Sequence, residues 1–156
     1  MPKTEAHASA PEGSLIALRS ILRELSPGAP LEESLGGLLK VLSKQMGYLR
    51  VFLVIMDPES ESLRLSLAHS PTRSIPVTYT PGQGVVGQVY ETGKAIIIPK
   101  LSENSEFLNK AFGRSPEELQ TLAFVSVPVT ITRHGVNEVL GALSADLPIM
   151  PEAELA

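Results

Sequence analysis

The chain contains no cysteine and no tryptophan, and it has no long hydrophobic run. Without cysteine, disulfides, thiolate catalysis, thiolate metal sites and covalent thioether cofactors are excluded. The apolar stretch 51–56 is far shorter than the roughly 20 residues that a membrane-spanning helix needs. The net charge of −4 comes from interspersed acids and bases, so the chain lacks the basic face typical of nucleic-acid binding. Because the first thirteen residues resemble no secretory signal, we expect a cytoplasmic protein.

A length of 156 residues suits one domain. Residues 1–13 are rich in Ala, Pro and Ser and predict a disordered lead-in, 14–147 form the predicted domain, and the prolines of 148–156 indicate an exit linker. One face of a helix is predicted within 14–26 by Leu15, Leu18, Leu22 and Leu25. This face either packs on its own domain or forms the seam of a homodimer, and the repeat is too short to decide between them.

Hydrophobic periodicity predicts a second helix at 30–46 and strands at 49–56, 62–69, 75–79, 123–130 and 138–145. A further short strand is expected at 95–98, before Pro99. Segment 101–120 is irregular, with short helical turns near 103–107 and 116–120. About six strands with hairpins at both ends of their order favour an α+β domain built around an antiparallel sheet.

The stretch 81–99 is the most informative in the chain, because it predicts a turn, a short helix and a short apolar strand. Its Gly82-x-Gly84-x-x-Gly87 matches the dinucleotide fingerprint literally. That fingerprint requires a long crossover helix between parallel strands, whereas Gly93 ends this helix after about nine residues. The glycines are better explained by a tight turn and close packing of a short helix.

Candidate catalytic groups are isolated from one another. His7, His69 and His134 have no second ligand at helical or hairpin spacing, and no serine lies in a nucleophile-elbow pattern. Glu117 and Glu118 follow Pro116 at a helix start, where acidic side chains favour the helix dipole. We therefore predict a non-enzymatic domain with no catalytic residue, no metal site and no required cofactor.

The glycine segment resembles the central motif of GAF domains: Pro81-Gly82-Gln83-Gly84-Val85-Val86-Gly87-Gln88-Val89, with Glu91-Thr92-Gly93 and Ile98-Pro99. Segments 107–109, 124–129 and 140–146 continue the resemblance in the same order. Over about residues 14–146 the chain is similar to the N-terminal GAF domain of Nif-specific regulatory proteins, which are sigma-54-dependent transcriptional activators.

The resemblance implies a six-stranded antiparallel sheet with the N-terminal helices on one face. A ligand pocket would lie on the other face, roofed by the short helix from Gly84 and by segment 101–120. It also implies a sensor that controls a neighbouring ATPase module, which this chain lacks. The implied signals are 2-oxoglutarate and contacts with nitrogen-status proteins, either a PII-type signal protein or an anti-activator.

A dicarboxylate in such a pocket would need cations or backbone amides to offset its charge. The candidate cations are Arg64, Lys100 and Arg114, and the amides near Gly84 could contribute. Walls and orientation would come from Tyr79, Phe107, Asn109, Phe124 and Ser126. Ser126 interrupts an otherwise apolar strand, so it is either satisfied within the protein or in contact with a ligand.

Alternative functions remain open at this point. The domain could serve only protein interaction and dimerisation, with its pocket filled by its own side chains. Asn109-Lys110 begins like the signature of cyclic-nucleotide GAF domains, but the later residues of that signature do not follow. A GAF-fold methionine sulfoxide reductase is disfavoured, because that chemistry uses cysteine.

Overall fold

The computed structural model describes residues 28, 30–70 and 77–149, so the helix predicted within 14–26 lies outside the described residues. The first described helix, α2 (Leu31–Met46), follows Pro30, which has a φ of −57° and a ψ of 140° and makes no side-chain cap hydrogen bond. It ends at Gly47, which has a φ of 74° and the left-handed conformation typical of a helix terminus. The end agrees with the sequence prediction, whereas the helix begins one residue later, so Pro30 precedes it instead of being its first residue.

Six strands form one sheet in the order β3-β2-β1-β6-β5-β4, and every neighbouring pair is antiparallel. This arrangement confirms the predicted α+β architecture. The strands and their bounds are β1 (Arg50–Asp57), β2 (Ser62–His69), β3 (Thr78–Tyr79), β4 (Ile96–Ile98), β5 (Leu122–Arg133) and β6 (Val136–Pro148). The last two are longer than predicted, and β6 includes Pro148, the first residue of the predicted exit linker.

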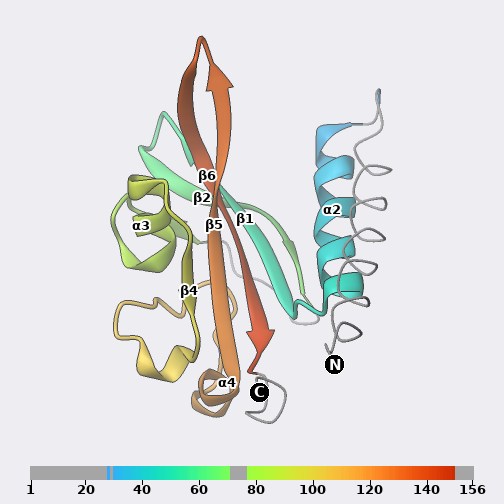
Figure 1. The fold of residues 1–156 in the computed structure, drawn as a ribbon, viewed down its shortest axis with the longest axis vertical. Coiled ribbons are helices and arrows are strands. Elements are labelled where there is room, and N and C mark those ends of the chain that lie inside the picture. The colour runs from blue at the N-terminus through green and yellow to red at the C-terminus, as the bar shows by residue number, and fades with distance from the viewer. Residues whose placement is uncertain (1–27, 29, 71–76, 150–156) are drawn as a thin grey trace, which may run out of the picture.

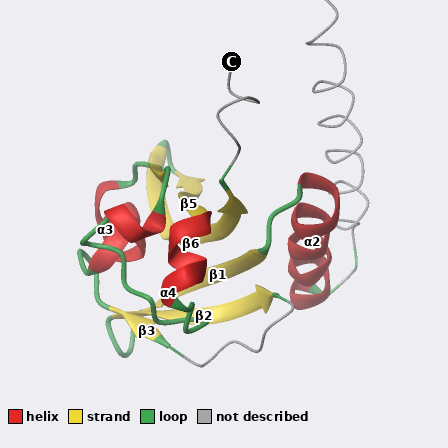
Figure 2. Ribbon diagram, turned by 90° about the horizontal axis from the view of Figure 1, so that it is seen from below, coloured by secondary structure: helices red, strands yellow, loops and turns green. Residues whose placement is uncertain are grey.

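The described helices lie on opposite faces of this sheet (Figures 1 and 2). Helix α2 packs on one face against β1 and β2, while α3 (Gly84–Thr92) contacts β5 and β6 from the other. Helix α3 ends at Gly93, which is again left-handed, as the sequence predicts. Its nine residues leave no parallel crossover, so the dinucleotide interpretation of the glycines has no support in the fold.

The segment between β4 and β5, residues 100–121, is termed the roof. It comprises a 3-10 turn, η2 (Leu101–Glu103), an irregular stretch 104–115, and the short helix α4 (Pro116–Thr121). Helix α4 begins with a capping box, in which Ser115 accepts from the Glu118 amide and the Glu118 carboxylate accepts from the Ser115 amide. The prediction of short helical turns is confirmed at 116–121, whereas the earlier turn lies nearer to β4 than expected.

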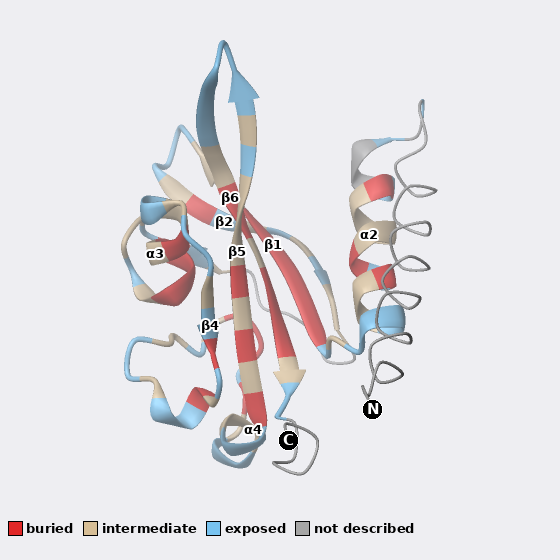
Figure 3. Cartoon of the chain, in the orientation of Figure 1, coloured by how far each residue is buried: buried red, intermediate tan, exposed pale blue. Residues whose placement is uncertain are grey.

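The hairpin of β5 and β6 extends beyond the rest of the sheet (Figure 1). Its turn is formed by His134 and Gly135, whose φ angles are both positive, at 51° and 77°. Two such residues match the right-handed twist of the flanking strands. The far end of the hairpin is exposed, whereas its base crosses the buried centre of the sheet (Figure 3).

Each face of the sheet has its own apolar cluster. The smaller one, centred on Leu39, Val51 and Ala145, lies between the sheet and α2. The larger one lies under α3 and the roof and contains Phe52, Phe124 and Val89, each at most 1 % exposed. The face that the sequence assigns to a ligand pocket is therefore densely packed with the protein's own side chains.

Candidate functional site

Strand alternation places six side chains on the sheet face beneath the roof. In one row across the sheet, Arg50 of β1 lies opposite Asp146 of β6, which lies opposite Phe124 of β5. The next row on the same face contains Phe52, Ser144 and Ser126. Because side chains two residues apart share one face of a strand, these residues form a two-row grid.

Asp146 is the charged centre of this grid and is fully buried. Its carboxylate accepts from Arg114 Nε at 2.6 Å and from Arg114 Nη2 at 2.7 Å, a bidentate pair. It also accepts from Arg50 Nη1 at 3.1 Å. One carboxylate thus binds two guanidinium groups, one from strand β1 and one from the roof.

Arg50 also contacts a second carboxylate. Its other terminal nitrogen donates to Glu118 of α4, whose side chain is 40 % exposed. The hydrogen bond from Arg50, followed by the one from the Ser115 backbone, holds the pKa of Glu118 below its usual value of 4.5. The four charged groups therefore balance, with two guanidinium groups and two carboxylates.

All four phenylalanines of the chain surround these arginines. The Arg114 guanidinium carbon lies 5.1, 5.4 and 5.9 Å from the ring centroids of Phe107, Phe112 and Phe124. Phe52 packs edge-on against Phe112 at 5.6 Å. The ring faces attract the cation and keep water from it, so they strengthen its interaction with a carboxylate.

Asn109 holds Arg114 in place through the backbone. The Asn109 side-chain amide donates to the Arg114 carbonyl at 2.7 Å, and its oxygen accepts from the Arg114 amide at 2.9 Å. The same oxygen lies 3.3 Å from Arg114 Nη1. Asn109 thus closes a small loop in the irregular part of the roof and aims Arg114 at Asp146.

The structure brings together five of the predicted site residues, places Tyr79 in the same buried cluster, and separates Arg64 and Lys100. The grouped residues are Phe107, Asn109, Arg114, Phe124 and Ser126. Arg64 lies on the surface, 60 % exposed, with its Nε 3.3 Å from an Asp57 oxygen. Lys100 is also partly exposed and lies 3.8 Å from Glu103. These two predicted cations are therefore outside the cluster.

Tyr79 is buried in the larger apolar cluster, together with Phe52 and Phe124 of the grid. Lys110 Nζ lies 5.2 Å from its ring centroid and donates to the Thr78 carbonyl at 3.1 Å. Burial of the hydroxyl raises the pKa of Tyr79 to about 12. Tyr79 is therefore a wall of the packed face, close enough to Arg114 and Asp146 for their charges to act on its hydroxyl.

Sequence reasoning left several members of the cluster out of the candidate site: Arg50, Phe52, Phe112, Glu118, Ser144 and Asp146. A usable signal was present, because Arg50 and Asp146 are charged residues at the ends of otherwise apolar strands. Such charges are rarely buried unless they are paired. An opposite charge at the end of each strand would have suggested that these two residues meet.

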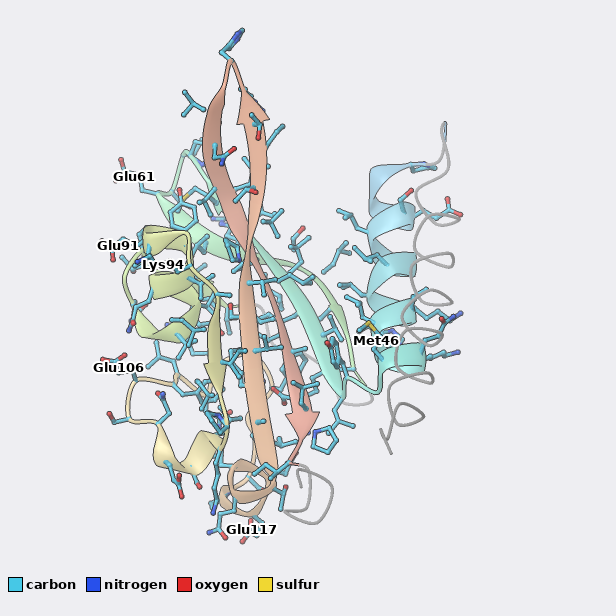
Figure 4. The ribbon with its side chains drawn as sticks, viewed as in Figure 1. Met46, Glu61, Glu91, Lys94, Glu106 and Glu117 are labelled. Atoms are coloured by element: carbon cyan, nitrogen blue, oxygen red, sulfur yellow. The ribbon has the colours of Figure 1, made fainter. Side chains whose placement is uncertain are left out.

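The surface of the molecule carries ordinary exposed charges. Glu61, Glu91, Glu106 and Glu117 lie at the periphery of the molecule, and their side chains point outward (Figure 4). No cluster of three potential metal-ligating His, Cys, Asp or Glu side chains occurs among the described residues. The charges of the grid are thus mostly buried, whereas these glutamates are exposed to solvent.

A cavity of about 200 Å³ lies on the opposite face of the sheet, near α2. Its lining is apolar apart from Tyr48 and Ser144, and it includes Leu42, Val51 and Val127. Among the described residues its lining holds no Lys or Arg, so a carboxylate would lack a charged partner there.

Comparison with known proteins identifies the family. The family model described as "GAF domain" matches residues 30–154. A Nif-specific regulatory protein from Azotobacter vinelandii is 29 % identical over 84 % of this chain and 25 % of its own length. A Nif-specific regulatory protein from Azospirillum lipoferum is 30 % identical over 85 % of this chain and 21 % of its own length. The nitrogen fixation protein VnfA from Azotobacter vinelandii is 30 % identical over 70 % of this chain and 21 % of its own length. The chain thus spans at most about a quarter of these relatives.

Solved structures agree on the fold. The A. aeolicus nlh2 GAF domain in an inactive state superposes with a TM-score of 0.74 and 24 % identity, covering 92 % of this chain and 85 % of its own. A free methionine-R-sulfoxide reductase from Neisseria meningitidis superposes with a TM-score of 0.67 and 18 % identity, covering 92 % and 81 %. Within the described part of the chain, no helix is long and apolar enough to cross a membrane. By its family model and its fold, the chain belongs to the GAF domain family.

Proposed function

We propose that this chain is the regulatory domain of a sigma-54-dependent activator of nitrogen-fixation genes, acting in the cytoplasm on an adjacent ATPase module. The observation that carries the proposal is the alignment of most of the chain with part of several nitrogen-fixation regulators. Because the matched part is at most about a quarter of each relative, we assign this chain to signal reception and the remainder to output. A PII-type protein or an anti-activator is the partner we propose.

We further propose that the signal is a small carboxylate, with 2-oxoglutarate as the first candidate. The support is chemical, because the roofed face contains two buried guanidinium groups surrounded by aromatic rings. Guanidinium groups bind carboxylates through paired, charge-assisted hydrogen bonds, and a dry environment strengthens those bonds. Of the three cations predicted from the sequence, Arg114 is the one in this environment.

We assign no catalytic activity to the domain. Methionine sulfoxide reductases occur among the proteins of similar fold, but their identity to this chain is 18 % or less. Redox catalysis through a thiolate requires cysteine, which this chain lacks. We therefore propose that the domain shares the fold of these reductases but not their catalytic activity.

Thermal unfolding tests the proposed effector directly. A ligand that binds only the folded state raises the unfolding midpoint by mass action. We expect millimolar 2-oxoglutarate to raise the midpoint and cyclic nucleotides to leave it unchanged. Calorimetry on Arg114→Ala, with Lys100→Ala as the matched control, should show lost binding in the first and retained binding in the second. No shift with 2-oxoglutarate would contradict the proposed effector.

A second candidate is a domain for protein interaction without a small ligand. It is favoured by the packing of the roofed face, where every buried side-chain nitrogen and oxygen of the described residues has a partner. In addition, Ile97 and Val136 expose 72 % and 66 % of their surface. Dimerisation through Leu15, Leu18, Leu22 and Leu25 belongs to this candidate, and these residues lie outside the described part. A mass that depends on concentration and falls to the monomer in Leu18→Asp plus Leu22→Asp would support it.

A further inference from the structure

Among the described residues, the Asp146 carboxylate is held inside the protein by charged donors alone. A single buried carboxylate accepts three N–H groups from two arginines. Bidentate pairing with Arg114 leaves each carboxylate oxygen with at least one charged donor. This arrangement is what a guanidinium pocket would provide for the carboxylate of a free ligand.

Stability alone does not explain the Arg114–Asp146 pair. Desolvation of two charges offsets most of their attraction, so well-packed apolar residues often replace buried ion pairs without loss of stability. Arg114 also comes from the irregular part of the roof, where Asn109 and Asp146 are its hydrogen-bonding partners. The pair therefore joins the least regular described segment on this face to the central strand β6.

Asp146 lies two residues before the end of β6. The Asp146 carbonyl accepts from the Leu49 amide at 2.8 Å, and the Ile149 amide donates to the Thr121 carbonyl at 3.1 Å. Three residues after Asp146 the chain thus contacts the end of helix α4. Release of the Asp146 side chain would weaken contacts of both β1 and the roof with the end of β6.

We propose that Asp146 occupies a carboxylate-binding subsite and that the regulatory ligand binds Arg114 by taking its place. The ligand class is a small mono- or dicarboxylate whose planar carboxylate matches the Arg114 fork, and Arg50 is its second donor. Because Arg114 and Asp146 are 4 % and 0 % exposed, entry requires the irregular stretch of the roof to lift. The inference rests on the proposed function, since it gives the carboxylate effector a site and a path to the end of β6.

The roof is held from outside by contacts that can open at low cost. Gln88 donates to Glu106 at 2.8 Å and Lys110 donates to the Thr78 carbonyl at 3.1 Å, both in exposed positions. Exposed hydrogen bonds of this kind exchange readily with water. The buried contacts to be broken are those of Phe107 with Phe124 and Arg114, and those of Phe112, which is 8 % exposed and packs on Phe52.

Chemical rescue tests the subsite. In the full chain, Asp146→Ala removes the internal carboxylate and leaves space for formate or acetate beside Arg114. We expect formate to raise the unfolding midpoint of Asp146→Ala by about 5 °C more than chloride at equal ionic strength, saturably. The wild type should show a smaller rise, and Arg114→Gln combined with Asp146→Ala should show none. Equal effects of formate and chloride on Asp146→Ala, or rescue that survives loss of Arg114, would overturn the proposal.

A measurement on the wild type keeps the proposal testable if Asp146→Ala does not fold. Amide hydrogen exchange is followed at Leu49 and Ile149 with 2-oxoglutarate, succinate or acetate at 50 mM, against chloride. We expect at least one carboxylate to speed hydrogen exchange at both amides severalfold. No change with any of them would refute the proposal that a ligand carboxylate displaces Asp146. A 2-oxoglutarate response that persists in Arg114→Ala would uphold the proposed effector and refute this subsite. A response to succinate but not to 2-oxoglutarate would uphold this subsite and refute 2-oxoglutarate as the effector.

Discussion

The hydroxyl oxygens of Ser126 and Ser144 lie 2.8 Å apart across β5 and β6, where the two residues are directly opposite each other. Their residues are 0 % and 1 % exposed, so each hydroxyl is the partner that satisfies the other. This pairing accounts for a polar residue in the apolar strand β5 without a ligand. It also shows how the grid beneath the roof combines a neutral pair with a charged one.

A double-mutant cycle should show whether Ser126 serves as the partner of Ser144 or as a ligand contact. Ser126→Ala leaves the Ser144 hydroxyl buried without its partner, which costs about 1–3 kcal/mol in the free energy of unfolding. Ser126→Ala combined with Ser144→Ala should recover most of that loss, because no polar group is then unsatisfied. Urea unfolding of the four proteins measures the coupling. Additive losses with a changed carboxylate affinity would instead assign Ser126 to a ligand.

Glu118 should make the domain acid-sensitive through Arg50. The folded state lowers the pKa of Glu118, so its stabilising contribution is present above the ordinary value of 4.5 and is lost as pH falls through the lower, folded value. We expect Glu118→Gln to flatten the dependence of the unfolding midpoint on pH below about 5. Because Glu118 is 40 % exposed, the difference should shrink in high salt. Parallel pH curves for both proteins would contradict this role.

Tyr79 should make the domain sensitive to alkali. Burial raises its folded pKa to about 12 from a usual value of 10.0. The neutral hydroxyl therefore stabilises the fold fully below pH 10, and this contribution is lost as pH rises through the folded value. At pH 11 the wild type should have lost about 1 kcal/mol relative to pH 9, and Tyr79→Phe should not share that loss. Chemical unfolding at both pH values measures the difference, and equal losses would show that Tyr79 titrates normally.

Gly87 is required for the close approach of α3 to the preceding turn. A Cβ atom at this position would lie 2.5 Å from the Thr80 carbonyl oxygen and 3.1 Å from the Gly82 nitrogen. Gly87→Ala should therefore lower the free energy of unfolding by about 1–3 kcal/mol. Gly135→Asn is the matched control, because Gly135 has open space around it and asparagine tolerates its positive φ. A similar loss in both variants would exclude the clash as the cause.

The fold was predictable because its signals are local. Alternation of leucine with polar residues marks β2, and the left-handed glycines Gly47 and Gly93 end α2 and α3 at the predicted positions. The same alternation already argued against Arg64 as a ligand contact, since it lies between Leu63 and Leu65 and must point to the other side of the strand. Local patterns therefore contained more information on this residue than the prediction used.

The charged grid was not predictable in full because its members meet only through long-range register. Arg50 and Asp146 are separated by 96 residues, and their contact depends on how β1 pairs with β6. A shift of one residue in that pairing would turn Asp146 to the opposite face. Arg114 was identified as a buried-site candidate, but its partner is an internal carboxylate rather than the ligand that the sequence suggested.

The Arg114–Asp146 pair offers a last prediction, on whether it serves stability or switching. Asp146→Leu alone leaves Arg114 buried among phenylalanines without an anion, and we expect it to lose about 3–5 kcal/mol in the free energy of unfolding. Arg114→Met combined with Asp146→Leu removes both charges while Arg50 keeps Glu118, so most of this loss should be recovered. Guanidinium unfolding of the three proteins gives both values. A recovered double variant that no longer responds to carboxylates would mean that the pair is dispensable for folding and needed for the signal. A double variant as unstable as Asp146→Leu would make the pair part of the folded framework.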